Sequence, residues 1–257
     1  MFGKKKKGGI HEKGNEHHAL QLITDKGMPF GYVEAYKSLR TNLDFMAGSM
    51  DVHTLVITST VPEESKSNVA INLALTLAES GKKVALVDCD LRKPVLHRYL
   101  KAGHNVKGVS NVLSNQCTLD EALQELKEMN LTFLPAGTPP PNPSEMLSQP
   151  QMQAMVDTLR QKFDFVIFDA PPVSVVTDAA VIGRYVDGAV FVVRSDYAPA
   201  DAVRGAVKKL QDAGVRVLGS VLTRYDMKKA LKGSSYAYSY AYNYNYAYEK
   251  QKADVTE

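Results

Sequence analysis

A lysine and a serine stand side by side where a β-branched run gives way to a helical pattern. Strand-like residues 53–59 lead into a short loop that ends in Lys66 and Ser67, and apolar residues at helical spacing follow to residue 80. A strand, a tight loop and a helix N-terminus in this order favour phosphate binding, because loop N–H groups and the helix dipole attract anions. The Lys-Ser pair adds the cation and the hydroxyl with which a P-loop holds phosphate oxygens and magnesium.

The loop departs from the usual P-loop pattern G-x-x-x-x-G-K-[ST]. Ser65 replaces the glycine before the lysine, and residues 59–67 contain no glycine at all. Because glycine permits positive φ and close approach of a phosphate, we expect Ser65 to strain the loop or to weaken binding. An ordinary strand-to-helix loop with an exposed lysine is the alternative for this segment alone. The candidate nucleotide-binding residues are Ser59, Thr60, Val61, Pro62, Glu63, Glu64, Ser65, Lys66, Ser67 and Asn68.

Three carboxylates follow two other apolar runs. Asp88 and Asp90 come at the end of the run that begins at residue 83, and Asp169 ends the run FVIFD. The carboxyl ends of parallel strands share one edge of the sheet, where open α/β sheets bind ligands. Asp169 has the position of a Walker B acid, which holds magnesium directly or through water. A single Asp after a strand is more often a loop or cap residue, but three acids and Lys66 together favour a nucleotide site.

An α/β domain is needed to bring these groups together. We expect strands at residues 53–59, 83–88, 131–134, 164–169, 188–193 and 216–222, and helices at residues 67–80, 119–129, 149–162, 178–185 and 201–213. The strands lack period-two polarity, as in a parallel sheet covered on both faces. The sequence therefore predicts one three-layer P-loop domain with a mostly parallel sheet over residues 28–226, preceded by an amphipathic helix at residues 34–45.

The segments on either side of this domain differ from it in composition. The net charge is +3, and an excess of lysine within residues 1–27 accounts for it, so the rest of the chain is neutral. We interpret residues 1–27 as a flexible basic arm. A neutral body lacks the basic face with which proteins bind nucleic acid, so we expect no nucleic-acid partner.

Cysteine content and hydropathy indicate a cytoplasmic location. The two cysteines, Cys89 and Cys117, cannot form a disulfide framework. The chain opens without a recognisable leader, and charged residues interrupt every apolar run before it reaches the length that spans a bilayer.

The C-terminal segment, residues 227–257, holds more than half of the 13 tyrosines of the chain in an alternating low-complexity run. Paired as a strand, this run would place all its tyrosines on one face and form an adhesive edge. As a flexible chain it would instead present one hydroxyl after another. The candidate phosphorylation sites are Tyr236, Tyr238, Tyr240, Tyr242, Tyr244, Tyr246 and Tyr248.

Taken together, these motifs resemble one family. They are EAYKSLRTNL, the loop ending SKS, VALVDCDLRKP, LPAGTPPPNPSEMLSQPQM, FDFVIFDAPPV with TDA after it, VVRSDYAP and the tyrosine cluster. The chain is similar over about residues 30–248 to the bacterial tyrosine kinases of capsule and exopolysaccharide systems in their separate cytoplasmic form. That family is related to the partitioning ATPases. The resemblance implies an ATP- and Mg²⁺-dependent protein-tyrosine autokinase that regulates capsule or exopolysaccharide synthesis.

The resemblance also assigns roles within the site. Lys66 and Ser67 would be the phosphate and magnesium groups of the loop, Asp88 and Asp90 the second carboxylate motif, and Asp169 the Walker B acid. On physical grounds we expect Ser67, Asp90 and Asp169 to surround magnesium. Asp88 is the best candidate to accept the proton of the incoming tyrosine hydroxyl, so the catalytic set is Asp88, Asp90 and Lys66. Arg92 has two open interpretations, one as neutraliser of an acid or phosphate and the other as a surface ion pair.

Partners follow from the same resemblance. The family assembles ring-like homo-oligomers through an ExxRxxR-like pattern, which reads Glu34, Lys37 and Arg40 here, and a lysine in the middle loses the bidentate fork of arginine. Each C-terminal segment would be phosphorylated in trans by a neighbour. A transmembrane chain-length regulator of polysaccharide export would recruit the kinase to the inner face of the membrane and activate it. Thr223 stands where relatives commonly have an asparagine that contacts adenine.

Two other functions stay open. Ser65 supports a degenerate relative that binds nucleotide poorly and acts as a scaffold of the polysaccharide machinery. A partitioning-type ATPase would use the same loop and acids, but it would leave the tyrosine run without a role.

Overall fold

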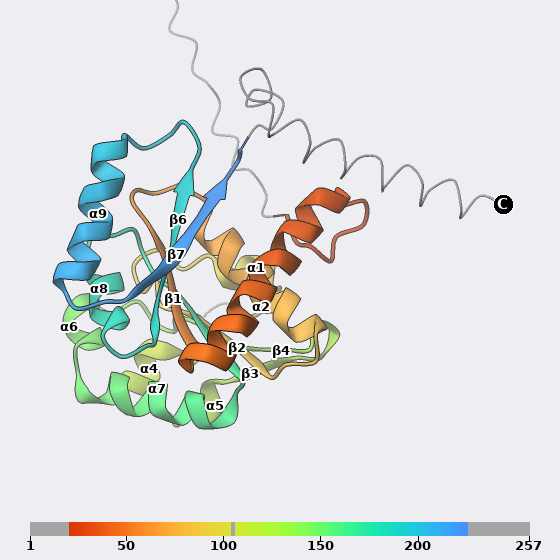
Figure 1. The fold of residues 1–257 in the computed structure, drawn as a ribbon. Coiled ribbons are helices and arrows are strands. Elements are labelled where there is room, and N and C mark those ends of the chain that lie inside the picture. Colours follow the sequence, from red (N-terminus) through yellow and green to blue (C-terminus); the bar gives the residue numbers. More distant parts are fainter. Residues whose placement is uncertain (1–20, 104–105, 226–257) are drawn as a thin grey trace, which may run out of the picture.

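The computed structural model describes residues 21–103 and 106–225 (Figure 1). Within them, seven strands form one sheet in the order β3-β4-β2-β5-β1-β6-β7. Neighbouring strands pair in parallel except for β3 and β4, which are antiparallel. The mostly parallel sheet predicted from the sequence is therefore confirmed. The strands are β1 (Thr54–Ser59), β2 (Val84–Asp88), β3 (Gln124–Leu126), β4 (Leu131–Leu134), β5 (Phe165–Asp169), β6 (Gly188–Arg194) and β7 (Val217–Thr223).

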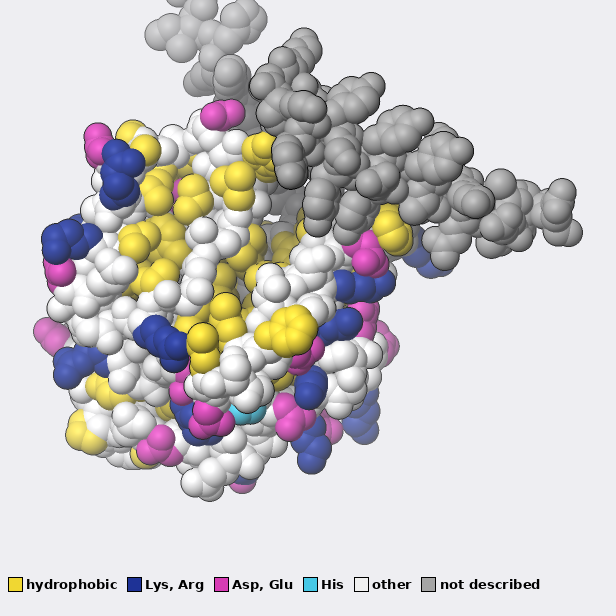
Figure 2. Space-filling view, in the orientation of Figure 1, with side chains coloured by type: hydrophobic (Ala, Val, Ile, Leu, Met, Phe, Trp, Pro, Cys, Tyr) yellow, Lys and Arg dark blue, Asp and Glu magenta, His cyan; other side chains and the backbone are white. Residues whose placement is uncertain are grey.

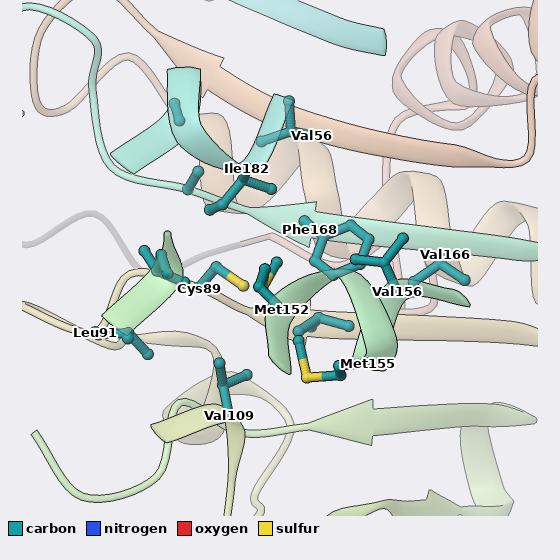
Figure 3. Close-up of a cluster of buried hydrophobic side chains, with 14 of the residues drawn as sticks. Val56, Cys89, Leu91, Val109, Met152, Met155, Val156, Val166, Phe168 and Ile182 are labelled. Atoms are coloured by element: carbon teal, nitrogen blue, oxygen red, sulfur yellow. The ribbon is translucent and has the colours of Figure 1, made fainter. Parts of the chain in front are cut away.

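Helices cover both faces of the sheet, as the unbroken apolar strands require. On one face lie α1 (Phe30–Met50), α2 (Lys66–Glu79) and the short α3 (Leu96–Tyr99). On the other face lie α4 (Val109–Leu113), α5 (Leu119–Ala122), α6 (Pro143–Leu147), α7 (Pro150–Lys162), α8 (Asp178–Gly183) and α9 (Ala200–Asp212). Alternate residues of β1 serve the two layers, since Leu55 and Ile57 pack with α2 while Val56 packs with α7 and α8 (Figure 3).

The helix predicted at residues 119–129 is wrong. Only α5 is α-helical there; β3 and a 3₁₀ turn at Lys127–Met129 follow it. The apolar residues of the segment serve opposite faces of the sheet, because Leu119 packs in the cluster with α7 whereas Leu126 and Met129 pack in the cluster with α2. A single helix cannot reach both faces, so tertiary pairing with β4 overrides the local helical pattern.

The N-terminal helix is longer than expected and the domain begins earlier. Helix α1 spans Phe30–Met50 rather than residues 34–45, and it packs against α2 through buried Tyr36 and Leu43. Within the last part of the predicted arm, Leu22 and Ile23 are also buried. The Ile23 N–H donates to Asn72 Oδ1 of α2 at 2.8 Å. Residues 21–27 therefore belong to the folded domain, which extends beyond the boundary expected at residue 28.

Hydrophobic side chains also gather on the surface. Figure 2 shows them on the face where β7 and α1 lie. Among the large apolar residues of α1 and β7, Phe45, Met50 and Leu222 are exposed at 71%, 51% and 52% of their full accessibility. Among the described residues, every helix is too short or too polar to cross a membrane.

Candidate nucleotide and magnesium site

The loop that joins β1 to α2, residues 60–65, contains no glycine. Two of its residues have positive φ, Glu63 at 67° and Ser65 at 71°. The expected strain at Ser65 thus has a structural basis, and Glu63 is a second such position that the sequence analysis missed. A left-handed residue other than glycine costs about 1–2 kcal/mol, so other contacts must hold the loop in place.

Glu64 supplies much of that support from inside the loop. Its side chain is completely buried, with one carboxylate oxygen accepting from Val61 N–H at 2.8 Å and the other from Arg194 N–H at 3.3 Å. The Thr223 hydroxyl donates to the Glu64 carbonyl at 2.9 Å, and Arg194 Nη1 donates to the Glu63 carbonyl at 3.3 Å. Glu64 therefore braces the loop, and Thr223 contributes a loop contact from the end of β7.

The polar side chains of Ser59, Thr60 and Asn68 differ in their hydrogen-bond partners. Ser59 Oγ donates to the Val61 carbonyl at 2.9 Å. Asn68 Oδ1 accepts from Tyr32 and Tyr36 of α1, at 2.9 and 3.0 Å, so its side chain is engaged with α1. The Thr60 hydroxyl is buried and has no hydrogen-bond partner among the described residues. A buried unpaired hydroxyl beside the loop is what a site for a polar ligand provides.

The structure brings Lys66 together with the predicted acids. Lys66 Nζ lies 3.4 Å from Asp90 Oδ2, 3.3 Å from Asp169 Oδ1 and 3.2 Å from Ser67 Oγ. Lys66 follows the carboxyl end of β1 and Asp169 ends β5. The two meet because β1 and β5 are parallel neighbours, with Ile57 opposite Asp169. Adjacent pairing of Asp88 with Asp169 places the third acid at the same edge.

Successive side chains after β2 point alternately into the hydrophobic core and toward Lys66. Cys89 and Leu91 are buried in the hydrophobic cluster around Met152 and Phe168 (Figure 3). Asp90 lies on the other side and holds the turn, because its Oδ1 accepts from Lys93 N–H at 2.9 Å. The core therefore fixes the chain on which the two carboxylates stand.

Burial sets the electrostatics of this cluster. Desolvation and the nearby Asp169 raise the pKa of Asp88 to about 8, although Lys66 opposes the shift. Desolvation also raises the pKa of Asp169 above its usual value. Burial alone would lower the pKa of Lys66, but the charges of Asp169, Asp90 and Asp88 outweigh it and raise that pKa. The lysine thus stays charged, and the acids crowd around one cation.

The oxygen donors at this edge suit magnesium with phosphate. Within the described residues no group of three or more His, Cys, Asp or Glu side chains forms a complete metal cage. Mg²⁺ does not require one, because it usually takes one or two carboxylates together with phosphate oxygens and water. Asp90, Asp169 and the Ser67 hydroxyl supply such a partial set of hard oxygen ligands, and the unpaired Thr60 hydroxyl lies in the adjoining loop.

The other predicted residues lie away from this site. Glu34 and Lys37 form an ion pair with each other at 2.6 Å on α1. Arg40 Nη1 donates to the Thr76 carbonyl of α2 at 3.0 Å, so this arginine joins α1 to its own domain. The seven candidate tyrosines, 236 to 248, lie outside the described residues.

One group of side chains beside the acids escaped the sequence analysis. Arg92, Ser144 and Asp178, here called the Asp178 cluster, form a closed hydrogen-bonded triangle. Arg92 pairs with the buried carboxylate of Asp178, so it neutralises an acid, and its contact with a phosphate stays a prediction. The motifs DLR, PSE and TDA contain these three residues, but their separation along the chain hides the contact.

Comparison with known proteins places this geometry in a family. The model of a family described as AAA domain matches residues 64–197. The tyrosine-protein kinase YwqD of Bacillus subtilis is 36% identical over 203 residues, which cover 79% of this chain and 84% of YwqD. The putative tyrosine-protein kinase CapB of Staphylococcus aureus is 35% identical, with 79% of this chain and 87% of CapB covered.

The chain belongs to the bacterial tyrosine-protein kinases. Solved structures of the family agree with this, since the kinase domain of Escherichia coli ETK matches with a TM-score of 0.72 and 34% identity over 74% of each chain. The chimerical protein CapA2B2 matches with a TM-score of 0.71 and 35% identity, covering 75% of this chain and 84% of the chimera. This chain therefore has the fold of the bacterial tyrosine kinases and is a protein-tyrosine kinase.

The same fold extends beyond tyrosine kinases. The septum site-determining protein MinD of Pyrococcus horikoshii, solved with Mg-ADP, has a TM-score of 0.59 and 24% identity over 68% of this chain and 71% of that one. At this identity the likeness shows the P-loop ATPase fold alone.

Proposed function

We propose that this kinase transfers the γ-phosphoryl group of ATP to tyrosines of its own C-terminal segment and thereby regulates capsule or exopolysaccharide synthesis. One observation carries the proposal. At the N-terminus of α2, side-chain oxygens of Ser67, Asp90 and Asp169 lie within 3.5 Å of Lys66 Nζ. A cation, a hydroxyl and carboxylates arranged around a helix N-terminus suit a nucleotide triphosphate with magnesium.

Each residue has a role in this proposal. The N–H groups at the start of α2 bind phosphate oxygens, and Lys66 neutralises the oxygens on which charge develops. Ser67, Asp90 and Asp169 would hold Mg²⁺, which supplies further charge neutralisation when bound. The buried Glu64 holds the loop in its binding shape.

The phosphoryl step is an in-line displacement. The tyrosine oxygen forms a bond to the γ-phosphorus while the bond to the bridging oxygen of ADP breaks. Asp88 in its ionised form takes the hydroxyl proton as the new bond forms and later releases it to water. The protein contributes mainly by positioning and by neutralising charge, because a tyrosine with a pKa near 10 need lose its proton only late in the reaction.

We further propose that the kinase acts as an assembly at the membrane. The α1 face with Glu34 and Lys37 and the exposed apolar residues on α1 and β7 provide surface for contact with further copies in a ring. The cytoplasmic end of a transmembrane chain-length regulator would recruit and activate it. Phosphates on the tyrosine segment add nearly two negative charges each, which would repel neighbouring copies and dissolve the ring.

Phosphotyrosine mapping tests the proposal. The purified chain is incubated with ATP, Mg²⁺ and the activator's cytoplasmic segment, and the products are mapped by mass spectrometry. We expect phosphate on residues within 236–248. A variant with Phe at all seven tyrosines should lose that label and keep nucleotide binding. Absence of label from the wild-type segment would reject the autokinase.

A scaffold that binds nucleotide poorly is the second candidate, favoured by the positive φ of Glu63 and Ser65. It predicts weak binding of ATP and no label. A partitioning-type ATPase would instead show hydrolysis stimulated by DNA or lipid.

A further inference from the structure

Asp178 is a completely buried carboxylate outside the set of acids that the proposed reaction uses. It begins helix α8, nine positions along the chain from Asp169. Burial of an ionised carboxylate is costly unless it is paired and hydrogen-bonded. The partners of Asp178 therefore show which parts of the fold this carboxylate joins.

Those partners come from the turn after β2 and from helix α6. Arg92 grips the carboxylate at both oxygens, with Nε 3.0 Å from Oδ2 and Nη2 3.3 Å from Oδ1. The Ser144 hydroxyl donates to Oδ1 of the same carboxylate and accepts from Arg92 Nη2 at 2.8 Å. The Asp178 cluster thus closes a triangle between the turn after β2, helix α6 and the start of α8.

The turn that Arg92 anchors is the one that carries two of the site acids. Asp90 N–H donates to Asp88 Oδ1 at 3.2 Å, and Leu96 N–H donates to Asp88 Oδ2 at 3.3 Å. Lys93 N–H donates to Asp90 Oδ1 at 2.9 Å. These are modest bonds within one turn, whereas the fork from Arg92 ties the turn to a different element. The chain from β5 to α8 likewise links Asp178 to Asp169.

We propose that Asp178 is a positioning residue that, through Arg92 and Ser144, holds the acid-bearing turn after β2 at a fixed place relative to Asp169. This inference rests on the proposed function, because it assigns to the cluster the task of keeping Asp90 and Asp169 at the spacing that magnesium requires. It gives one role to Arg92, Ser144 and Asp178, which the proposed chemistry otherwise leaves unused. Outer partners that orient metal-binding side chains commonly change metal affinity by 10–100-fold when they are removed.

The first measurement uses the full chain without metal or nucleotide. Asp178→Asn keeps the shape of the side chain but removes the charge and one acceptor oxygen. We expect amide hydrogen exchange in residues 89–96 to accelerate at least about tenfold, because the turn loses its outer anchor. The matched control is Asp187→Asn, which breaks the ion pair with Arg160 at the opposite edge of the sheet and should leave residues 89–96 unchanged.

The second measurement is direct binding of Mn²⁺, as a spectroscopic substitute for Mg²⁺, in the presence of ADP. We expect Asp178→Asn to raise the half-saturating Mn²⁺ concentration about tenfold, while Asp187→Asn stays within about twofold of the wild type. Arg92→Lys keeps the charge but loses the fork, and Ser144→Ala keeps the ion pair; both should shift exchange and Mn²⁺ binding in the same direction by less.

The outcomes separate the two proposals. Wild-type exchange in residues 89–96 of Asp178→Asn would overturn the positioning role, whatever the wild type binds. Failure of the wild type to bind Mn²⁺ with ADP would overturn the magnesium site of the proposed function, while the exchange measurement would still decide on the anchor. If Asp178→Asn does not fold, Arg92→Lys and Ser144→Ala decide it, and wild-type exchange and Mn²⁺ binding in both would reject the inference.

Discussion

At each end of strand β1 a basic side chain lies against carboxylates, but only at the amino end do the positive and negative charges balance. There Asp187 pairs with Arg160 and accepts from the N–H groups of His53 and Thr54 at 2.8 and 2.7 Å. Burial alone would raise the pKa of Asp187, but the hydrogen bonds from Arg160 and the two N–H groups outweigh it and lower that pKa. A carboxylate with a lowered pKa stabilises the fold at neutral pH.

At the carboxyl end the charges do not balance. Asp88, Asp90 and Asp169 all lie around the ammonium of Lys66, whose contacts with the latter two are 3.3 Å or longer. The pKa of Asp88 is raised to about 8 by burial and by Asp169. Here the folded chain holds acids together at a cost in stability.

This difference distinguishes a structural ion pair from a site prepared for a ligand. The amino end is complete without any further group. The carboxyl end has excess negative charge, an unpaired Thr60 hydroxyl and two strained loop residues, and such features concentrate at functional sites. A variant at the carboxyl end should therefore lose activity and gain stability, and a variant at the amino end should lose stability and keep activity.

The largest effect is expected from Lys66→Met. It removes the ammonium that lies against Asp90 and Asp169, so phosphotyrosine labelling should fall by roughly 10²–10³-fold or more. Leaving buried carboxylates without their partner should also destabilise the fold, by about 3–5 kcal/mol. Labelling is measured with radioactive ATP and stability by urea unfolding. Lys209→Met changes an exposed lysine of α9 and should match the wild type; labelling retained in Lys66→Met would contradict the assignment of the site.

Asp88→Asn should separate activity from stability. Removal of the proton acceptor should lower labelling by about 10²–10⁴-fold. The same change removes a buried carboxyl whose pKa of about 8 makes it take up a proton on folding at neutral pH. The free energy of unfolding at neutral pH should therefore rise by roughly 1–2 kcal/mol. Labelling is measured with radioactive ATP, and urea unfolding without nucleotide, on portions of the same preparation. A variant that is both inactive and less stable would show that Asp88 is a structural acid.

Asp187→Asn should give the opposite result. It weakens the pair with Arg160, so the free energy of unfolding should fall by about 1.5–3 kcal/mol, while labelling of the folded protein stays at the wild-type level. Because the pKa of Asp187 is lowered in the folded state, its contribution is present above the unfolded pKa near 4 and is lost as the pH falls through the folded pKa. The difference in urea stability between wild type and variant should therefore be full at pH 7 and shrink below about pH 4. An equal difference at pH 3 and pH 7 would contradict this.

The sequence predicted the parts of the molecule that depend on local pattern. Unbroken apolar runs ending in Asp88 and Asp169 are sufficient to place two acids at one edge, because parallel strands end together. The Lys-Ser pair likewise identifies the start of α2. The helix predicted at residues 119–129 failed because its apolar residues divide between the two faces of the sheet, a fact of tertiary packing.

Contacts between distant segments could not be read from the sequence. Glu64 follows Glu63 in the chain and looks like a second exposed loop acid, yet it is buried because the ends of β1 and β6 lie side by side and bring Arg194 N–H to it. Arg92 meets Asp178 for the same reason, across 86 positions of sequence. Such pairs are set by strand order, which a single sequence does not disclose.

The smallest expected effect concerns the strained loop between β1 and α2. It tests whether strain at the carboxyl end of β1 affects ligand binding. Ser65 has a φ of 71°, so Ser65→Gly should relieve strain in the loop and tighten binding of a fluorescent ATP analogue by about two- to fivefold. Ser80→Gly, at the other end of the same helix, is the matched control: Ser80 has a φ of −82°, so glycine relieves nothing there. If Ser65→Gly binds the analogue no better than Ser80→Gly, the serine is accommodated without cost to binding. The braces from Glu64, Arg194 and Thr223 would then be sufficient to hold the loop ready for phosphate without glycine.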